Sequence, residues 1–403
     1  MLKLYSEIFR PPGAKGFAAA GFVARLPIAM STIGIVAMLS QTHGAYGLAG
    51  AVAATFALTN ALAAPQISRL VDRLGQRRVL APATTLSVLG FIGLMIATHL
   101  DGPAWMLFAF ALLAAAMPSM PAMVRARWTE LYRDTPQLAT AFAFESVADE
   151  LVYISGSALA VGLSVSLFPE AGPLASTIFL AVGSAAFILQ KRTEPKIQPA
   201  ASRGGTATIR LRPVQIVTLA LVAIGAIFGT AEVTVIALTA EFGNAAAASL
   251  VVGGYAVGSM FVGLVYGALK PTMALSRQFA IAIGIAAATT VPLLFVANIP
   301  MLAFALFLSG AAISPTFITA FGLIERLVPS AKLTEGITWV MTGIGIGMAI
   351  GSFASGWVID AFGAGQGFWI SVAAGGVAFA TALFGQRSLA VPDCSGEGVP
   401  ACA

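Results

Sequence analysis

Long apolar stretches, interrupted at short intervals by polar or turn-rich breaks, dominate the chain. A helix that crosses a membrane needs roughly 20 apolar residues, and twelve stretches meet this requirement. They lie at roughly residues 17–40, 47–68, 79–98, 104–124, 138–167, 174–190, 214–240, 246–269, 277–297, 301–325, 335–361 and 367–386. The stretches are apolar on all faces, whereas membrane barrels show strands of about ten residues that alternate in polarity. The pattern predicts an all-α integral membrane protein with twelve transmembrane helices.

The composition excludes the main alternatives to a membrane protein. Of the 403 residues, 58% are hydrophobic and only 10% are charged, and the mean hydropathy is +0.90. A soluble domain carries about 25% charged residues, and a chain with far fewer would expose large apolar patches to water. Disorder requires low hydrophobicity and high net charge. Ordinary soluble enzymes and disordered chains are therefore excluded.

Lys and Arg residues sort to alternate breaks between the predicted spans. Of the 22 basic residues, 21 lie before the first span, after the last span or in every second break. The intervening breaks contain none. Because loops rich in Lys and Arg face the cytoplasm, both termini are predicted to be cytoplasmic, in a bacterial inner membrane. The net charge of +5 is then a topology signal, and no nucleic-acid partner is needed to explain it.

The chain termini suggest neither a cleaved leader nor a bound cofactor. The first apolar run is too long for a signal peptide and lacks an obvious small-residue cleavage site, so we expect it to remain as the first span. The two cysteines, Cys394 and Cys402, lie in the polar tail. Thiols stay reduced in the cytoplasm, and no histidines cluster with them. We therefore expect no structural disulfide, no metal site and no cofactor.

A basic, Pro- and Gly-containing loop divides the chain into two halves with six spans each. The predicted division is an N-terminal half at 1–190, a central cytoplasmic loop at 191–213, a C-terminal half at 214–386 and a polar cytoplasmic tail at 387–403. Weak internal matches support a repeat: an offset of 199 residues pairs Arg78 with Arg277, and an offset of 195 pairs Gly156 with Gly351. Transporters built from such repeats bind substrate near the membrane midplane, between the repeats.

The break between spans 2 and 3 contains a specific motif, SRLVDRLGQRR. It resembles the loop motif of the major facilitator superfamily, Gly-x-x-x-Asp-Arg-x-Gly-Arg-Lys/Arg-Arg/Lys. The matching residues are Asp72, Arg73, Gly75, Arg77 and Arg78, while Ser68 replaces the leading Gly and Gln76 replaces an Arg. The resemblance, closest in kind to bacterial twelve-span efflux proteins, implies a protein that functions as a monomer. It also implies a loop that latches the halves on the cytoplasmic side, with Asp72 facing the start of the eleventh span. A carboxylate is favoured there by the positive end of a helix.

Ionisable residues at membrane depth are costly and are candidates for function. Arg25 is expected to be the only basic residue within a span, and span 5 carries Glu145, Asp149 and Glu150. Glu145 and Asp149 are four residues apart, so they share a helix face, and Arg25 can pair with one of them. We expect at least one of the three acids to carry protons or bind substrate. The alternative is a fixed buried ion pair with a structural role. Glu232 in span 7 is a second candidate, with a structural role at the outer mouth as its alternative.

Apolar and small residues within the spans suggest packing and lining positions. Gly343, Gly347 and Gly351 are spaced by four, which predicts close helix packing rather than a nucleotide-binding loop. Residues that could line a substrate cavity, each with plain packing as the alternative, are Phe22, Met30, Phe56, Asn60, Phe142, Phe228 and Tyr255.

These features favour a secondary transporter over an enzyme or a channel. The predicted function is proton-coupled efflux of a small, partly apolar organic compound by alternating access, with the proton gradient as the energy source. The short loops, the intact latch motif and the mostly apolar spans favour export. Proton-coupled uptake of a small metabolite is the alternative. A membrane-embedded enzyme or a passive channel is a remote one, because the sequence shows no metal cluster, no nucleophile with a His partner and no filter-like loop.

Overall fold

The computed structural model describes residues 2–43, 46–197, 207–244, 247–269 and 273–390. Within these ranges the chain forms helices and no strands. The α-helices are α1 Leu2–Glu7, α2 Ala14–His43, α3 Tyr46–Leu74, α4 Gln76–His99, α5 Ala104–Ala114, α6 Met120–Tyr132, α7 Gln137–Ser166, α8 Ala171–Leu189, α9 Arg212–Glu241, α10 Ala247–Ala268, α11 Leu275–Thr290, α12 Ile299–Ala311, α13 Ile313–Leu327, α14 Leu333–Phe362 and α15 Phe368–Leu389. Cys394 and Cys402 lie outside the described residues.

The predicted membrane architecture is confirmed. Among the described residues, eleven helical segments are long and apolar enough to cross a membrane, and the shorter apolar helix α5 belongs to a twelfth. Helices α2 to α8 pack mainly with one another, as do α9 to α15. The chain is therefore a multi-pass membrane protein built from two helical halves.

The fourth predicted span is not one continuous helix. It consists of α5, a non-helical stretch at 115–119 that contains Pro118, and α6, so the prediction of a single helix over 104–124 is wrong. The side-chain amide of Asn60 on α3 donates hydrogen bonds to the carbonyls of Ala115 and Met117, both at 3.0 Å. Irregular backbone is tolerated at membrane depth where such partners exist. In span 10 only one residue, Ala312, separates α12 from α13.

The extent of α6 changes the assignment of two arginines. The charge pattern places Arg125 and Arg127 in the break between predicted spans 4 and 5. In the structure both lie on α6, and their side chains are buried. Arg25, predicted to be the only basic residue within a span, is therefore not the only arginine that is buried on a helix. Helix α6 continues past residue 124 because nothing in MVRARWTELY interrupts it before the turn that follows Tyr132.

Glycines bring α9 and α14 into close contact. A Cβ atom added at Gly347 would overlap the carbonyl oxygen of Val222, and one at Gly351 would overlap that of Ala226. Gly225 and Gly229 make the matching approach from α9 to the backbone of α14. The predicted glycine stripe is thus a helix-packing surface in the C-terminal half.

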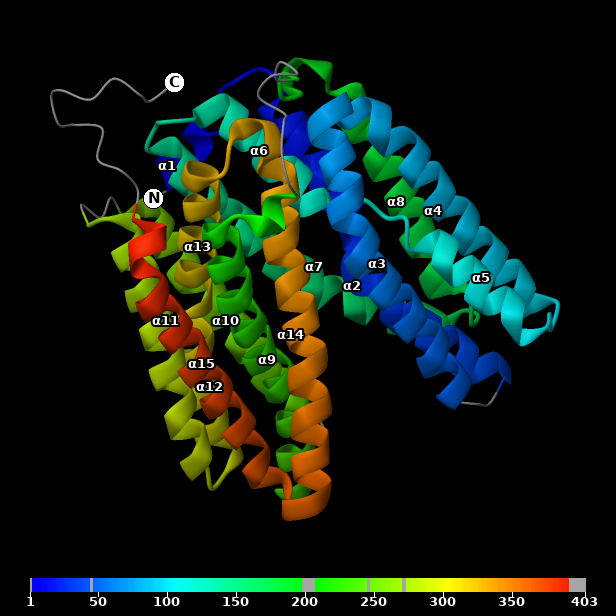
Figure 1. Ribbon diagram of the computed structural model, residues 1–403. Coiled ribbons are helices and arrows are strands. Elements are labelled where there is room, and N and C mark those ends of the chain that lie inside the picture. The colour runs from blue at the N-terminus through cyan, green and yellow to red at the C-terminus, as the bar shows by residue number, and fades with distance from the viewer. Residues whose placement is uncertain (1, 44–45, 198–206, 245–246, 270–272, 391–403) are drawn as a thin grey trace, which may run out of the picture.

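The two halves meet at one end of the molecule and diverge toward the other (Figure 1). Helix α6 and the N-terminus of α14 lie at the end where the halves meet, which we call the closed end. Here Thr140 donates a hydrogen bond to the carbonyl of Gly267 at 3.0 Å, and Arg133 pairs with Glu325 at 3.6 Å. We call the opposite end, where the halves separate, the diverging end. The candidate sites below are located relative to these two ends.

Candidate functional site

Asp72 joins the halves at the closed end. Its Oδ2 accepts a hydrogen bond from the backbone N–H of Glu335 at 2.8 Å, and its Oδ1 accepts one from that of Thr334 at 3.2 Å. Both N–H groups belong to the first turn of α14, where a helix has unpaired donors and a partial positive charge. Ser68, one turn earlier on α3, hydrogen-bonds Thr338 at 2.8 Å. Two residues of the loop motif, Ser68 and Asp72, thus contact the first turns of α14.

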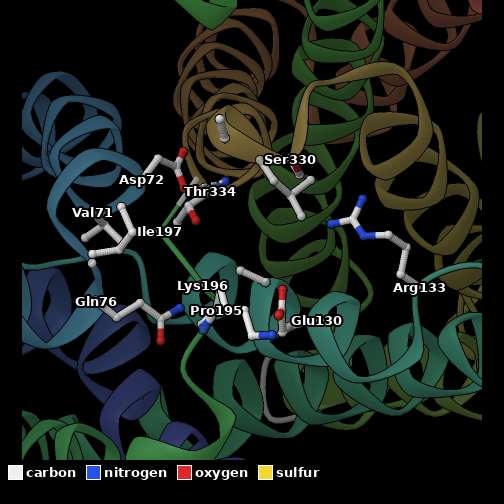
Figure 2. A pocket seen from close by; sticks show the side chains of 14 residues that line it. Val71, Asp72, Gln76, Glu130, Arg133, Pro195, Lys196, Ile197, Ser330 and Thr334 are labelled. Carbon is white, nitrogen blue, oxygen red and sulfur yellow. Dashed lines mark hydrogen bonds between the residues drawn. The ribbon is translucent and has the colours of Figure 1, made fainter. Parts of the chain in front are cut away.

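The remaining motif residues shape the turn between α3 and α4. Gly75 has φ of +90°, a conformation that glycine adopts without strain. The backbone N–H of Arg77 donates to Glu194 at 2.9 Å, and the side chain of Arg78 is exposed. Gln76, which departs from the family pattern, bridges the carbonyl of Met123 and the guanidinium of Arg127. Figure 2 shows the small pocket beside Asp72, lined by residues of both halves.

The N-terminal segment also spans the halves at the closed end. The Tyr5 hydroxyl donates a hydrogen bond to the carbonyl of Leu264 on α10 at 2.8 Å. Burial raises the pKa of Tyr5 to about 12, so the hydroxyl remains a donor at neutral pH. Tyr132 on α6 donates to the carbonyl of Ile8 at 2.9 Å. Residues 5–8 thus connect α6 in one half with α10 in the other.

A cluster of four ionisable side chains lies inside the N-terminal half. Arg25 donates to Asp149 at 2.7 Å and forms a very short contact with Glu145, while Arg125 donates to the second oxygen of Asp149 at 2.7 Å. Trp128 donates its indole N–H to Glu145 at 2.7 Å. Arg25, Arg125 and Glu145 are essentially inaccessible, and Asp149 is 8% exposed. The two guanidinium groups balance the two carboxylates, as buried charges require.

Sequence reasoning identified three members of this cluster and missed the fourth. Arg25, Glu145 and Asp149 come together, with Arg25 paired to both acids rather than one. Arg125 was missed because every arginine near a span end was read as a loop residue. A signal was present: MVRARWTELY contains no helix breaker and carries Trp128, which suits a buried helix better than a solvated loop.

Glu150 follows the cluster in sequence but faces the other half. It accepts a hydrogen bond from Ser259 on α10 at 2.8 Å, and Ser259 in turn contacts Ser314 on α13 at 2.9 Å. No ion pair of Glu150 occurs among the described residues. Glu150 is thus a carboxylate at the junction of the halves whose hydrogen-bond partner is a neutral hydroxyl.

Glu232 lies on α9, one turn beyond Phe228 toward the diverging end, and its side chain is exposed. Phe228 packs edge-to-face with Tyr255 at 5.2 Å and stacks with Phe317 at 6.2 Å between ring centroids. The Tyr255 hydroxyl is buried with no hydrogen-bond partner among the described residues. An aromatic group and an exposed carboxylate therefore occupy one face of the C-terminal half.

The other candidate lining residues have packing environments. Met30, Phe142 and Phe56 are at most 3% exposed and belong to apolar clusters. Phe22 is half-buried beside Leu26 and Met30 on α2. Asn60 supports the break in span 4, as described above. Phe228 and Tyr255 also pack in an apolar cluster, but they form an aromatic group that contains a buried hydroxyl without a hydrogen-bond partner among the described residues. Within the described residues, no group of three or more His, Cys, Asp or Glu side chains forms a metal-binding cluster.

The sequence matches the family model described as Major Facilitator Superfamily over residues 17–241 and again over residues 217–393. Each match corresponds to about one half of the molecule. No curated protein sequence matches the chain significantly.

Several solved transporter structures share the fold at low sequence identity. A bacterial homologue of the iron transporter ferroportin in an outward-facing state is 15% identical, with a TM-score of 0.73 over 93% of this chain and 99% of the other. The human organic anion transporter MFSD10 is 14% identical, with a TM-score of 0.71 over 94% of this chain and 100% of the other. The E. coli fucose:proton symporter is 18% identical, with a TM-score of 0.66 over 91% and 98%. At these identities the likeness establishes the fold alone.

Proposed function

Because this chain belongs to the Major Facilitator Superfamily, we propose that it is a proton-coupled antiporter that exports a small, partly apolar organic compound. Membership of this family makes the protein a membrane transporter rather than an enzyme. Transporters of two-repeat architecture work by alternating access, in which the halves rock around a site at their interface. A conformation closed at one end and divergent at the other is one end state of such a cycle.

Glu150 is the residue that best supports proton coupling. Protonation of Glu145 or Asp149 would leave a buried guanidinium without its carboxylate, which is costly. Within the described part of the chain Glu150 accepts a hydrogen bond from the Ser259 hydroxyl alone, so a proton can bind or leave without breaking an ion pair there. A hydrogen bond to an ionised carboxylate is roughly twice as strong as a neutral one. The charge on Glu150 therefore alters the bond that joins the halves, which links proton binding to conformation.

The charge balance at the interface favours a neutral or cationic compound. Glu150 and Glu232 have no ion-pair partner among the described residues, whereas both cluster arginines are paired. Phe228, Tyr255 and Phe317 offer aromatic faces beside them. Aromatic faces attract cations as well as apolar groups, so we expect an aromatic or aliphatic compound, with an amine favoured over a carboxylate.

We propose that the closed end faces the cytoplasm. The basic residues of the latch motif and of α6 gather at this end, and basic segments flank spans on the cytoplasmic side. The conformation is then open outward. Protons that drive export enter from outside, so an antiporter has to receive its proton in the outward-open state.

Flux measurements in proteoliposomes test the proposed function. The purified protein is reconstituted, and an imposed pH gradient drives a panel of labelled aromatic amines, neutral aromatic alcohols and aromatic carboxylates. Export predicts that an amine or a neutral compound moves against the direction of proton flow. Movement with the protons would establish uptake instead, and preferential transport of the carboxylates would contradict the proposed substrate class.

Glu150→Gln tests the assignment of the coupling residue. The variant keeps a hydrogen-bonding group of similar size but cannot change charge, so we expect loss of gradient-driven flux with retention of substrate counterflow. Asp360→Asn is the matched control, because Asp360 is an exposed acid near the far end of α14. If Glu150→Gln retained driven flux, the proton would have to bind elsewhere.

A further inference from the structure

Arg125 contacts both halves of the protein. Its Nη2 donates to the Oδ2 of Asp149 in the N-terminal half at 2.7 Å. Its guanidinium carbon lies 4.1 Å from the centre of the Phe321 ring, which belongs to α13 in the C-terminal half. Arg125 is 0% and Phe321 is 1% exposed. A cation over an aromatic face is attracted by the ring, most strongly where both groups are shielded from water.

Arg127, two residues further along α6, has a different environment. It is also buried, but its guanidinium donates to Gln76, Thr193 and the carbonyls of Gln190 and Phe187, at 2.8 to 3.1 Å. Its aromatic partners, Phe187 and Phe17, lie in the N-terminal half as well. Arg127 therefore stabilises one half internally. Arg125 is the buried arginine of α6 that depends on the other half.

Arg125 is also the less firmly held of the two cluster arginines. Arg25 donates to both Glu145 and Asp149 and to the carbonyl of Gly21. Arg125 has one carboxylate bond, a 3.5 Å contact to the carbonyl of Pro121, and an Nε–H that is buried with no acceptor among the described residues. A buried unsatisfied donor is destabilising. If negative charge on α7 decreases, Arg125 is the cation that is released first.

We propose that Arg125 is a positioning residue that couples the charge on the α7 carboxylates to closure between the halves, through its contact with Phe321. The proposal rests on the proposed proton coupling. Glu145 and Asp149 hold both guanidinium groups inside the protein, and Phe321 covers Arg125. Glu150 adds a further negative charge to the same helix, next to Asp149, so proton uptake by Glu150 lowers the negative charge on α7 and weakens the attraction for Arg125. Arg125 then gains free energy by moving toward water, which requires Phe321 and α13 to move away.

The charged and titratable groups near the contact between Arg125 and Phe321 come from several helices. Helix α2 contributes Arg25, and α7 contributes Glu145, Glu150 and Tyr153. Helix α10 contributes Tyr255, which packs against Phe228, and α8 contributes no titratable residue. At the closed end, Glu335 of α14 accepts from Thr208 at 2.8 Å, and Glu325 of α13 pairs with Arg133. Asp149 of α7 is the carboxylate that contacts Arg125. Further titratable groups at this end are Tyr5 and Glu7 of α1 and the exposed Lys191 and Arg192 that follow α8.

Distance measurements between spin labels test the coupling. Labels at Arg192→Cys and Arg277→Cys, in a Cys394→Ser/Cys402→Ser background, report the separation of the closed ends of the two halves, since both sites are exposed. The full-length protein in nanodiscs is titrated from about pH 8 to about pH 5, the range over which shifted carboxylates commonly change charge. The closed-to-open ratio is the number of molecules closed at this end divided by the number open there. In the labelled protein without further substitutions, we expect this ratio to fall as the pH falls.

Two substitutions and a control test whether Arg125 causes this pH dependence. Phe321→Leu retains an apolar side chain without the aromatic face, and Arg125→Lys retains charge without the planar guanidinium. We expect each to lower the closed-to-open ratio at high pH by about 3- to 30-fold, the range that a cation–π contact supplies, and to flatten the pH profile. Arg127→Lys is the control and should keep the wild-type pH profile. A purely structural role for Arg125 would lower stability without changing that profile.

The outcomes separate this proposal from the proposed function. Wild-type ratios and wild-type pH profiles in both Phe321→Leu and Arg125→Lys would refute the role of Arg125 while proton-driven flux remained intact. A lowered ratio with an unchanged pH profile would also refute it, because the contact would then stabilise closure without sensing charge. Absence of gradient-driven flux would refute the proposed proton coupling, whatever the labels report.

Discussion

At the scale of single residues, the buried ion cluster combines a structural cost with a functional opportunity. Charges inside a low-dielectric interior are tolerated only in pairs, and removing one partner costs about 3–5 kcal/mol because the other charge is left uncompensated. Arg25 is the most connected member, since it donates to Glu145 and Asp149. Arg25 therefore links α2 to α7, while Glu150 lies outside the ion pairs and accepts a hydrogen bond from Ser259.

Arg25→Gln tests the structural part of this division. Two buried carboxylates would lose their shared cation, so we expect the free energy of unfolding to fall by about 3–5 kcal/mol, measured by thermal unfolding in detergent. Arg192→Gln, an exposed arginine outside the cluster, should change stability by no more than about 0.5 kcal/mol. Equal stability of the two variants would show that the cluster does not hold α2 in place.

The residues of this site were only partly predictable from sequence. The helical spacing of Glu145 and Asp149 and the isolation of Arg25 within an apolar run were sufficient to predict their contact. Glu150 points in a different direction from Asp149 because neighbouring helical residues are rotated by about 100°, but its partner Ser259 lies 109 positions away. Such a contact depends on how the halves are arranged, which local sequence does not reveal.

At the scale of helices, the break in span 4 depends on a distant side chain. Pro118 marks a possible kink in the sequence, but kinked helices also occur at proline without a gap in the helix. The additional feature is Asn60 on α3, which satisfies two carbonyls of the non-helical stretch. Sequence-based span prediction treats each apolar run separately, so it placed one helix where there are two and put Arg125 in a loop.

Asn60→Leu should therefore destabilise the protein. The substitution keeps the side-chain size but leaves the carbonyls of Ala115 and Met117 without this donor, at an expected cost of about 1–3 kcal/mol. Gln66→Leu on the same helix is the control, because Gln66 is exposed. Thermal unfolding of both variants in detergent provides the comparison. Equal melting temperatures would mean that the break does not require Asn60.

Glycine packing between α9 and α14 allows a second test at this scale. A methyl group at Gly347 meets the backbone of Val222 and Ala226, whereas one at Gly345 meets nothing within 4 Å. Gly347→Ala should force the helices apart and cost about 1–3 kcal/mol. Gly345→Ala should be neutral or slightly stabilising, because Ala is the better helix former. The stability difference between two substitutions in one helix isolates the packing term, and it would vanish if the helices did not pack through this face.

At the scale of the whole molecule, closure is distributed over several contacts that all lie toward one end. Asp72 binds the first turn of α14, Tyr5 reaches α10, and Arg133 reaches α13. The apolar pattern and the two-half division were predictable because each half repeats the same order of spans. The conformation was not, because both end states of an alternating-access cycle bury the same helices and differ only in which inter-half contacts form.

Asp72→Asn tests how much the latch contributes to that choice of state. The amide oxygen can still accept a hydrogen bond, but the negative charge at the N-terminus of α14 is lost, and this interaction is worth about 0.3–2 kcal/mol. We expect the closed-to-open ratio, measured with the same pair of labels, to fall by about 2- to 30-fold. Turnover should slow because the cycle then returns less readily to the closed state, while the binding affinity for a transported compound should stay unchanged. Asp134→Asn, an exposed acid at the same end whose φ of +59° asparagine also tolerates, should behave as wild type. If Asp72→Asn left both the ratio and the turnover unaltered, closure would depend on the remaining contacts, and the motif would serve topology alone.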